Sequence, residues 1–333
     1  MSDHTKIEWA DATVNAVNGC SVLSPGCTNC YAMASGGRNL PNHPSTGLTK
    51  LVNGNHVWTG EVRLTEKALL QPLRWKAPRR IFWNAHGDLF HEAVPDRWID
   101  QVFAVCALTP QHQHLILTKR SARMREYVNA NRWQNVLDEQ YELQAAGRSS
   151  EQPVGEAWPL PNVWLGVSVE DQARADQRIP DLLATPTAVR FISAEPLLGP
   201  IDLGNVFASM DHHGIYVNDP LILGLDWVIV GGESGNFARP MHPDWAISLR
   251  RQCTVARVPF FFKQWGSCLP GDMEGEGEFG EPAYNIDYAA QPVDYDKLGR
   301  GRLVIAQGDS FIHFGNKKTG RRLNGREHSE FPA

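Results

Sequence analysis

The sequence predicts a mixed α/β protein built on a parallel (β/α) barrel, partial or complete. Seven short apolar segments recur along the chain and helical patterns separate most of them, as in parallel sheets covered on both faces. No dinucleotide-binding glycine fingerprint opens any predicted helix, which favours a barrel over a doubly wound sheet. Polar residues follow the segments directly, where the C-terminal rim of a barrel carries its functional groups. We therefore expect a TIM-like barrel with insertions and a C-terminal extension.

The apolar segments give the strands in chain order. We expect strands at residues 13–17, 80–85, 114–117, 162–167, 188–192, 226–230 and 258–262. Thr65 caps a helix over 65–75, and Asp96 caps a second one that runs to Cys106 with its apolar residues on one face. Further helical patterns cover 172–183 and 243–255.

The predicted barrel covers residues 1–268. It is interrupted by insertions near 35–60, 126–160 and 204–224, which are polar or rich in glycine and proline. Residues 269–333 form an extension with an acidic, glycine-rich linker at 271–280 and a basic tail at 317–326. The basic tail is either a solvated surface or a contact for an anion or nucleic acid. The pair His212-His213 is expected to be a solvated loop feature.

Composition limits the class of protein. The chain has 333 residues, of which 42% are hydrophobic, enough for one large or two ordinary domains. A net charge of −5 excludes a global basic field for nucleic acid. No apolar run approaches the roughly 20 residues of a membrane span, and the N-terminus lacks a secretory signal. We therefore expect a cytoplasmic protein without a membrane partner.

The most informative segment holds three of the six cysteines, Cys20, Cys27 and Cys30, with the spacing C-x6-C-x2-C. Its glycines and proline make it a turn-rich loop, which can bring three thiolates to one centre. Three thiolates suit zinc or an iron–sulfur cluster. Structural zinc needs a fourth ligand, for which His43 and His56 are the next candidates. A four-iron cluster held by three cysteines instead leaves one iron open. Buried apolar cysteines and disulfides are the remaining alternatives, disfavoured by the polar loop and the odd number.

The polar residues after the strands form the second group of candidates. Each could simply cap the following helix, but in a barrel all of them share one rim. They are Asp88, Lys119, Ser168, Glu170, Glu195, Glu233 and Lys263.

The chain resembles the phage Gp37/Gp68-like proteins, a family of unknown function also called three-Cys-motif proteins. The matching stretches run through nearly the whole chain. They are Ile7–Trp9, Gly19–Cys20, Ser24–Cys27, Cys30–Ala32, Gly87–Glu92, Leu117–Arg120, Pro161–Asp171, Ser193–Leu198, Gly231–Gly235, Phe262–Gly266 and Gly320–Leu323.

A more distant resemblance is to the radical S-adenosylmethionine enzymes, which carry three cysteines in a loop after the first strand of a partial barrel. Their usual spacing is C-x3-C-x2-C, whereas the first gap here is six residues. Their aromatic residue precedes the last cysteine, whereas Asn29 stands there and Tyr31 follows Cys30. Their glycine-glycine-acidic motif ends the second strand, whereas Gly231-Gly232-Glu233 follows a later one.

This second resemblance implies a [4Fe-4S] cluster on the three cysteines and S-adenosylmethionine on its open iron. Asp88 would accept from the methionine ammonium, and Lys119 or Arg120 would pair with the carboxylate. Ser168, Glu170 and Glu195 would hold ribose hydroxyls or substrate, and Gly231 and Gly232 would let the backbone lie close to the adenine. Tyr31 is a further implied cofactor contact. Glu233 and Lys263 are the candidate catalytic residues.

The resemblances imply a radical enzyme that generates a 5′-deoxyadenosyl radical. A nucleic-acid base or nucleoside in a phage context is the expected substrate, through DNA modification. Such an enzyme needs a reductase or other electron donor, and a partner protein encoded nearby is a further expectation. The alternative is a zinc-binding or structural-cluster protein that acts as a nucleic-acid-associated accessory factor.

Overall fold

The computed structural model describes residues 5–38, 40–41, 43–155, 157–204, 206–210, 216–276, 282–285, 302–306, 309–314 and 319–332. The chain divides into two compact units. The first comprises Met1–Val167 and Arg178–Phe191, and the second Ser168–Gln177 and Ile192–Ala333. The predicted boundary at residue 268 stays a prediction. His212, His213, Lys317, Lys318 and residues 277–280 of the acidic linker lie outside the described residues.

The main sheet has seven strands in the order β1-β6-β7-β8-β9-β12-β13. They are β1 (Ala12–Val14), β6 (Arg80–Trp83), β7 (Gln113–Thr118), β8 (Val163–Ser168), β9 (Val189–Ala194), β12 (Trp227–Gly231) and β13 (Phe260–Gln264). Parallel pairing joins β1 to β6, β6 to β7, β7 to β8 and β12 to β13. These are the seven predicted strands, so the mixed α/β class with a parallel sheet is confirmed. β1 and β13 stand at opposite ends of the order, so the hydrogen-bonded order is open and agrees with a partial barrel.

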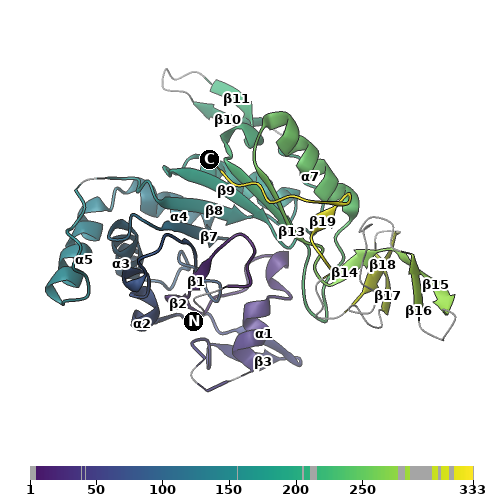
Figure 1. Ribbon diagram of the computed structural model, residues 1–333, viewed down its shortest axis with the longest axis horizontal. Coiled ribbons are helices and arrows are strands. Elements are labelled where there is room, and N and C mark those ends of the chain that lie inside the picture. The colour runs from purple at the N-terminus through teal and green to yellow at the C-terminus, as the bar shows by residue number, and fades with distance from the viewer. Residues whose placement is uncertain are drawn as a thin grey trace. The chain divides into compact units, whose positions relative to one another are not determined.

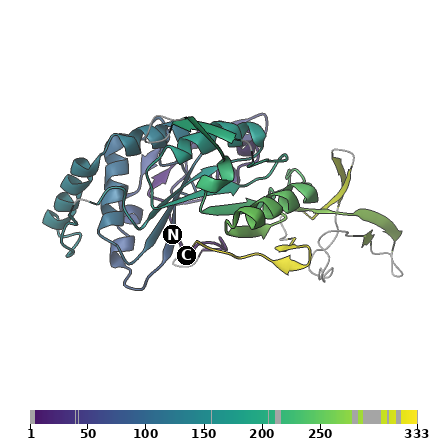
Figure 2. The ribbon, with the colours of Figure 1, turned by 90° about the horizontal axis from the view of Figure 1, so that it is seen from above.

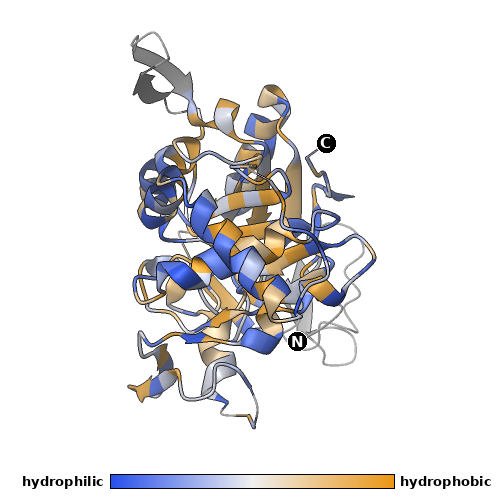
Figure 3. Ribbon diagram, turned by 90° about the vertical axis from the view of Figure 1, so that its left-hand side faces the viewer, coloured by the Kyte–Doolittle hydropathy of each residue, from blue (hydrophilic) through white to orange (hydrophobic). Residues whose placement is uncertain are grey.

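The strands bury their central residues, which are mostly apolar, while polar residues such as Arg80, Gln113 and Lys263 stand near their ends. All six residues of β8 and all five of β12 are buried. Figure 3 shows the strands largely in hydrophobic colours and the helices with mixed faces. A strand that is apolar throughout needs cover on both faces, which explains why helices alternate with these strands.

Helices of the first unit connect its strands. They are η1 (Pro25–Cys27), α1 (Tyr31–Gly37), α2 (Glu66–Leu69), η2 (Pro72–Arg74), α3 (Asp96–Ala107), α4 (Ser121–Asn129) and α5 (Trp133–Ala145). In α3, eight of the twelve residues are buried, and α3 lies beside α5 (Figure 1). α6 (Gln172–Leu183) occupies the predicted range 172–183.

Two local predictions were wrong. The helix expected over 65–75 ends at Leu69 and is followed by the short 3-10 turn η2. Pro72 explains the break, because it has no N–H to donate to the carbonyl four residues earlier, as a continuing α-helix requires. The stretch 35–60, expected to be irregular, contains the antiparallel hairpin β3 (Thr49–Val52) and β4 (Asn55–Trp58). Asn53 and Gly54, both at positive φ, form its two-residue turn. The small antiparallel pair of β2 (Val17–Asn18) and β5 (Arg63–Leu64) flanks the cysteine segment, with β2 before it in the chain and β5 after it.

The second unit packs α7 (Pro243–Ala256) against β12 and β13, as Figure 2 also shows. Its remaining elements are β10 (Val206–Met210), β11 (Tyr216–Pro220), η3 (Leu221–Gly224), β14 (Cys268–Pro270), β15 (Asp272–Glu276), β16 (Pro282–Asn285), β17 (Arg302–Ala306), β18 (Asp309–His313), β19 (Arg322–Leu323) and β20 (Arg326–Glu327). β14, β18 and β17 form a three-stranded antiparallel sheet. In the part of the chain described here, no helix has the length and apolarity needed to cross a membrane.

Candidate functional site

The cysteine segment follows β2 and lies beside the loop that follows β6. Gly19 forms a parallel bridge with Gly87, so the two loops leave the carboxyl edge of the sheet together. A Cβ at Gly19, whose φ is +94°, would lie 2.1 Å from the carbonyl oxygen of Glu61, and one at Gly87 would lie 2.5 Å from that of Val17. Both positions therefore require glycine. This close approach puts Cys20 next to the polar groups after β6.

Asp88 is the first of these groups, and it is buried, with 5% of its surface exposed. Its Oδ1 accepts from the Phe90 backbone N–H (3.0 Å) and from the Thr118 hydroxyl (2.7 Å). Its Oδ2 accepts from the Lys119 backbone N–H (3.1 Å) and from Nη1 of Arg120 (3.1 Å). The carboxylate thus joins the loop after β6 to the end of β7 and uses the roughly four acceptor positions it has.

Arg120 connects this carboxylate to the cysteine segment. Its Nη1 also lies 3.4 Å from the Cys20 sulfur, and its Nη2 donates to the Ser21 hydroxyl at 2.7 Å. Its Nε donates to the carboxylate of Glu92, and only 4% of the side chain is exposed. Burial on its own would lower the pKa of Arg120, but the charges of Asp88, Cys20 and Glu92 raise it, so the guanidinium is a permanent cation.

Ser21 is held from a second side by His91. The His91 Nδ1 accepts from the Ala93 backbone N–H at 3.1 Å, so in the neutral ring the proton is on Nε2. That Nε2 lies 3.0 Å from the Ser21 hydroxyl oxygen. Burial, and then the charge of Arg120, lowers the pKa of His91, which favours this neutral form.

The three thiols have different surroundings. Burial, followed by the charge of Asp88, raises the pKa of Cys20 to about 12, while Arg120 acts in the opposite direction. Burial also raises the pKa of Cys30, and the hydrogen bonds from the Met33 and Ala32 backbone N–H groups at the start of α1 act to lower it. The Cys27 sulfur lies 3.8 Å from the Ser24 hydroxyl. Cys27 interacts electrostatically with both Cys20 and Cys30, so the three sulfurs share one region.

Tyr31 begins α1 immediately after Cys30. Its hydroxyl donates to the carbonyl of Ala85 at 2.8 Å, and its ring meets that of His86 edge-on. It therefore ties the end of the cysteine segment to the loop after β6. His43 and His56, the candidate fourth ligands for zinc, make contacts near α1: His43 Nδ1 accepts from the Ser45 N–H, and the His56 ring lies against Gly37.

In the second unit, Glu195 and Lys263 form an ion pair. The Lys263 Nζ donates to Glu195 Oε1 at 2.6 Å, and the two side chains are only 16–18% exposed. Glu195 follows β9 and Lys263 belongs to β13. A Cβ at Gly231 would lie 3.0 Å from the Glu195 carboxylate, so glycine at this position leaves room for the pair. The proposed catalytic lysine is thus held beside a proposed cofactor-binding carboxylate.

Glu233 lies on the same unit and pairs with Arg239. Its Oε2 accepts from both the backbone N–H and the Nε of Arg239 at 2.9 Å. Gly232, directly before it, packs so closely that a Cβ there would lie 1.9 Å from the carbonyl oxygen of Trp265. Ser168 and Glu170 are both buried. The Glu170 carbonyl accepts from the Leu198 N–H at 2.7 Å, next to the turn that carries Glu195.

The structure therefore gathers Cys20, Cys27, Cys30, Tyr31, Asp88 and Lys119 in the first unit, and Glu195, Gly231 and Lys263 together with Glu233 and Gly232 in the second. That both groups line a single cavity stays a prediction. Sequence reasoning missed Ser21 and Glu92, and it missed Arg239 as the partner of Glu233. Ser21 had a signal in its position directly after a cysteine, and Glu92 had one in the matching stretch Gly87–Glu92, whereas Arg239 lies outside the matching stretches.

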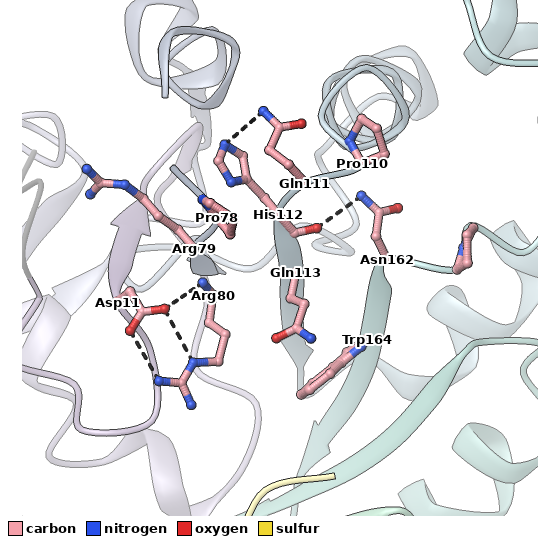
Figure 4. A pocket seen from close by; sticks show the side chains of 11 residues that line it. Asp11, Pro78, Arg79, Arg80, Pro110, Gln111, His112, Gln113, Asn162 and Trp164 are labelled. Atoms are coloured by element: carbon pink, nitrogen blue, oxygen red, sulfur yellow. Dashed lines mark hydrogen bonds and ion pairs between the residues drawn. The ribbon is translucent and has the colours of Figure 1, made fainter. Parts of the chain in front are cut away.

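A separate pocket of about 530 Å³ lies at the opposite, amino edge of the strands of the first unit (Figure 4). Arg80 begins β6, Gln113 begins β7 and Asn162 precedes β8. Arg80 is paired through two N–H groups with Asp11, and the Arg79 guanidinium lies 4.6 Å from the centre of the Trp75 ring. Besides the ion pair between Arg80 and Asp11, the lining carries the Arg79 guanidinium and amide side chains, which can donate to an anionic ligand.

The chemistry of the three-cysteine segment can be compared with what a metal group needs. Among the described residues, no three His, Cys, Asp or Glu side chains form a group that could hold a metal ion. A cluster takes each thiolate on a different iron, so its ligands stand farther apart than those of one ion. The donor set itself fits: three thiols from one segment, a guanidinium at one sulfur and backbone N–H groups at another.

Comparisons of this chain with curated proteins and with solved structures find no match. One family, described as "Protein of unknown function (DUF5131)", matches residues 4–332, which is nearly the whole length. The chain therefore belongs to the DUF5131 family.

Proposed function

We propose that this chain is an iron–sulfur enzyme of the radical S-adenosylmethionine type, on a partial, TIM-like barrel, related to the phage three-Cys-motif proteins. The observation that carries the proposal is the cysteine segment at the carboxyl edge of the sheet. There the Arg120 guanidinium contacts both the Cys20 sulfur and the Asp88 carboxylate. A [4Fe-4S] cluster with S-adenosylmethionine bound supplies one-electron cleavage of the sulfonium to a 5′-deoxyadenosyl radical.

The residues of the chain have separate parts in this proposal. Cys20, Cys27 and Cys30 hold the cluster. Lys119 is the cation for the methionine carboxylate. Asp88, whose oxygens already accept from four protein donors, contributes negative charge near the ammonium and not a direct hydrogen bond. In the second unit the ion-paired Glu195 and Lys263, with Glu170, Ser168 and the Gly231–Gly232 turn, bind nucleoside or substrate groups, and Glu233 faces the substrate. The substrate is a nucleic-acid base or nucleoside, and a reductase supplies the electron.

The test is anaerobic purification followed by iron and sulfide analysis, the visible spectrum and an assay for 5′-deoxyadenosine. Wild-type protein should be brown and should release 5′-deoxyadenosine when reduced with S-adenosylmethionine. Replacing any one of the three segment cysteines by Ala should abolish iron loading, whereas Cys106→Ala and Cys253→Ala, at buried positions in α3 and α7, should leave it intact. Full iron loading in Cys27→Ala would refute the ligand assignment. A loaded protein that neither binds nor cleaves S-adenosylmethionine would leave a structural cluster, and zinc in place of iron would favour the accessory-factor alternative.

One observation favours a second candidate function, association with nucleic acid. The pocket at the amino edge has Arg79 stacked on Trp75, next to Arg80 and the amides of Gln111 and Gln113. Guanidinium groups and amides of this kind bind phosphates and bases. A fluorescent single-stranded oligonucleotide should bind with salt-dependent affinity, and Arg79→Ala should weaken it several-fold, by roughly 1 kcal/mol. Arg148→Ala, which removes an exposed ion pair with Glu66, is the matched control. Equal affinities for both variants would remove this candidate.

A further inference from the structure

The Arg120 side chain is the most heavily bonded charged group in the described part of the cysteine region. Its three nitrogens contact Cys20, Ser21, Asp88 and Glu92, and 4% of the side chain is exposed. A guanidinium held on all sides cannot move to a ligand without breaking these contacts. Its position is therefore fixed by the fold, and one of its N–H groups is directed at a sulfur.

The other two cysteines lack an equivalent neighbour in the contacts described. Cys27 lies beside the neutral Ser24 hydroxyl, and Cys30 receives backbone N–H groups from α1. Among the described contacts, the sulfur of Cys20 has the Arg120 guanidinium 3.4 Å away, whereas the charge of Lys119 acts electrostatically on Cys30. The three thiolates would therefore share negative charge unequally.

On the basis of the proposed iron–sulfur function, we infer that Arg120 is a positioning residue that sets the reduction potential of the cluster through its hydrogen bond to Cys20. A donor to a ligating sulfur withdraws electron density from it, and a nearby positive charge stabilises the reduced, more negative cluster. Both effects raise the reduction potential. The buried Asp88 opposes part of the charge, so the hydrogen bond to sulfur is the distinctive contribution.

The bonding pattern also assigns the supporting residues. The Ser21 hydroxyl accepts from Nη2 of Arg120, and the Glu92 carboxylate accepts from its Nε. The Ser21 hydroxyl is itself fixed by His91, whereas the Glu92 side chain is 63% exposed. Removing Glu92 should relax the guanidinium only slightly, because solvent can replace an exposed carboxylate. Removing the guanidinium should have the full effect on the cluster.

The experiment is a redox titration, followed by electron paramagnetic resonance, of the anaerobically reconstituted full-length chain. Arg120→Gln should lower the midpoint potential by at least the equivalent of tenfold in the reduction equilibrium, which is about 59 mV for one electron. Arg120→Lys retains the charge without the planar fork and should give an intermediate value. Glu92→Gln should shift the potential least.

The matched control is Arg132→Gln, which removes a comparable bidentate arginine from the buried Asp100 in α3 without a contact to the cysteine segment. It should cost stability but leave the potential unchanged. Wild-type protein that takes up no iron and sulfide overturns the proposed function and this inference together. A loaded Arg120→Gln protein with the wild-type potential overturns this inference alone. If Arg120→Gln does not fold, an unchanged potential in Arg120→Lys does the same.

Discussion

Replacing Asp88 by Asn gives the most direct energetic test of the network that holds the cysteine segment. The substitution preserves size but exchanges one oxygen for an NH2 group. If the oxygen of the new amide keeps the Phe90 and Thr118 donors, its NH2 group faces the Lys119 N–H and the Arg120 guanidinium. All three of these groups are hydrogen-bond donors, so none of them has an acceptor there.

The magnitude follows from burial. Asp88 and Arg120 have side chains only 7% and 4% exposed, so solvent cannot replace the lost bonds. Hydrogen bonds to charged groups contribute about 1.5–3 kcal/mol each, and removing one partner of a buried ion pair costs about 3–5 kcal/mol. We expect Asp88→Asn to lower the free energy of unfolding by about 3–5 kcal/mol at pH 7.

The assay is urea unfolding monitored by tryptophan fluorescence, with Glu66→Gln as control. Glu66 pairs with Arg148 at the same kind of distance, 3.2 Å, but the side chains are 67% and 50% exposed. Its loss should cost less than about 1 kcal/mol. The double variant Asp88→Asn/Arg120→Gln should lose less than the sum of the two single variants, because both belong to one network. Equal costs for Asp88→Asn and Glu66→Gln, or additive single losses, would refute the reasoning.

Three further predictions concern other parts of the chain. The buried His114 accepts from the Trp83 indole N–H, and burial lowers its pKa to about 3. Below pH 6.5 the unfolded chain therefore binds a proton at His114 that the folded chain does not bind. The contribution of His114 to the free energy of unfolding is present above pH 6.5 and is lost as the pH falls. The stability advantage of wild type over His114→Gln should therefore shrink by about 1.4 kcal/mol between pH 7.5 and 5.5 in urea titrations, and a constant difference would contradict this. Gly232→Ala should fail to give folded protein by circular dichroism, because its Cβ would meet backbone at 1.9 Å, whereas Gly155→Ala, with open space, should fold normally. Lys263→Met should lower the midpoint of thermal unfolding by leaving the Glu195 carboxylate without its cation, at a cost of about 3 kcal/mol, and Lys263→Arg should recover most of it; no recovery would argue against the ion pair as the cause.

The sequence by itself determined the parallel sheet and the cysteine segment. Strands such as β8 and β12 are apolar throughout, and this pattern has few stable outcomes besides a strand covered on both faces. The cysteine spacing places three thiols within eleven residues whatever the fold around them. Local patterns failed where a single residue changed the geometry, as at Pro72, where a predicted helix ends early.

Only the tertiary structure decided what surrounds these residues. Arg120 is one hundred positions from Cys20 in the chain, and no spacing rule connects its guanidinium to that sulfur. The contact exists because the parallel pairing of β6 and β7 brings their carboxyl ends together, while Gly19 and Gly87 let the two loops touch. Ion pairs form between side chains that pairing and packing bring together, so a linear pattern can propose charged candidates but cannot say which of them meet.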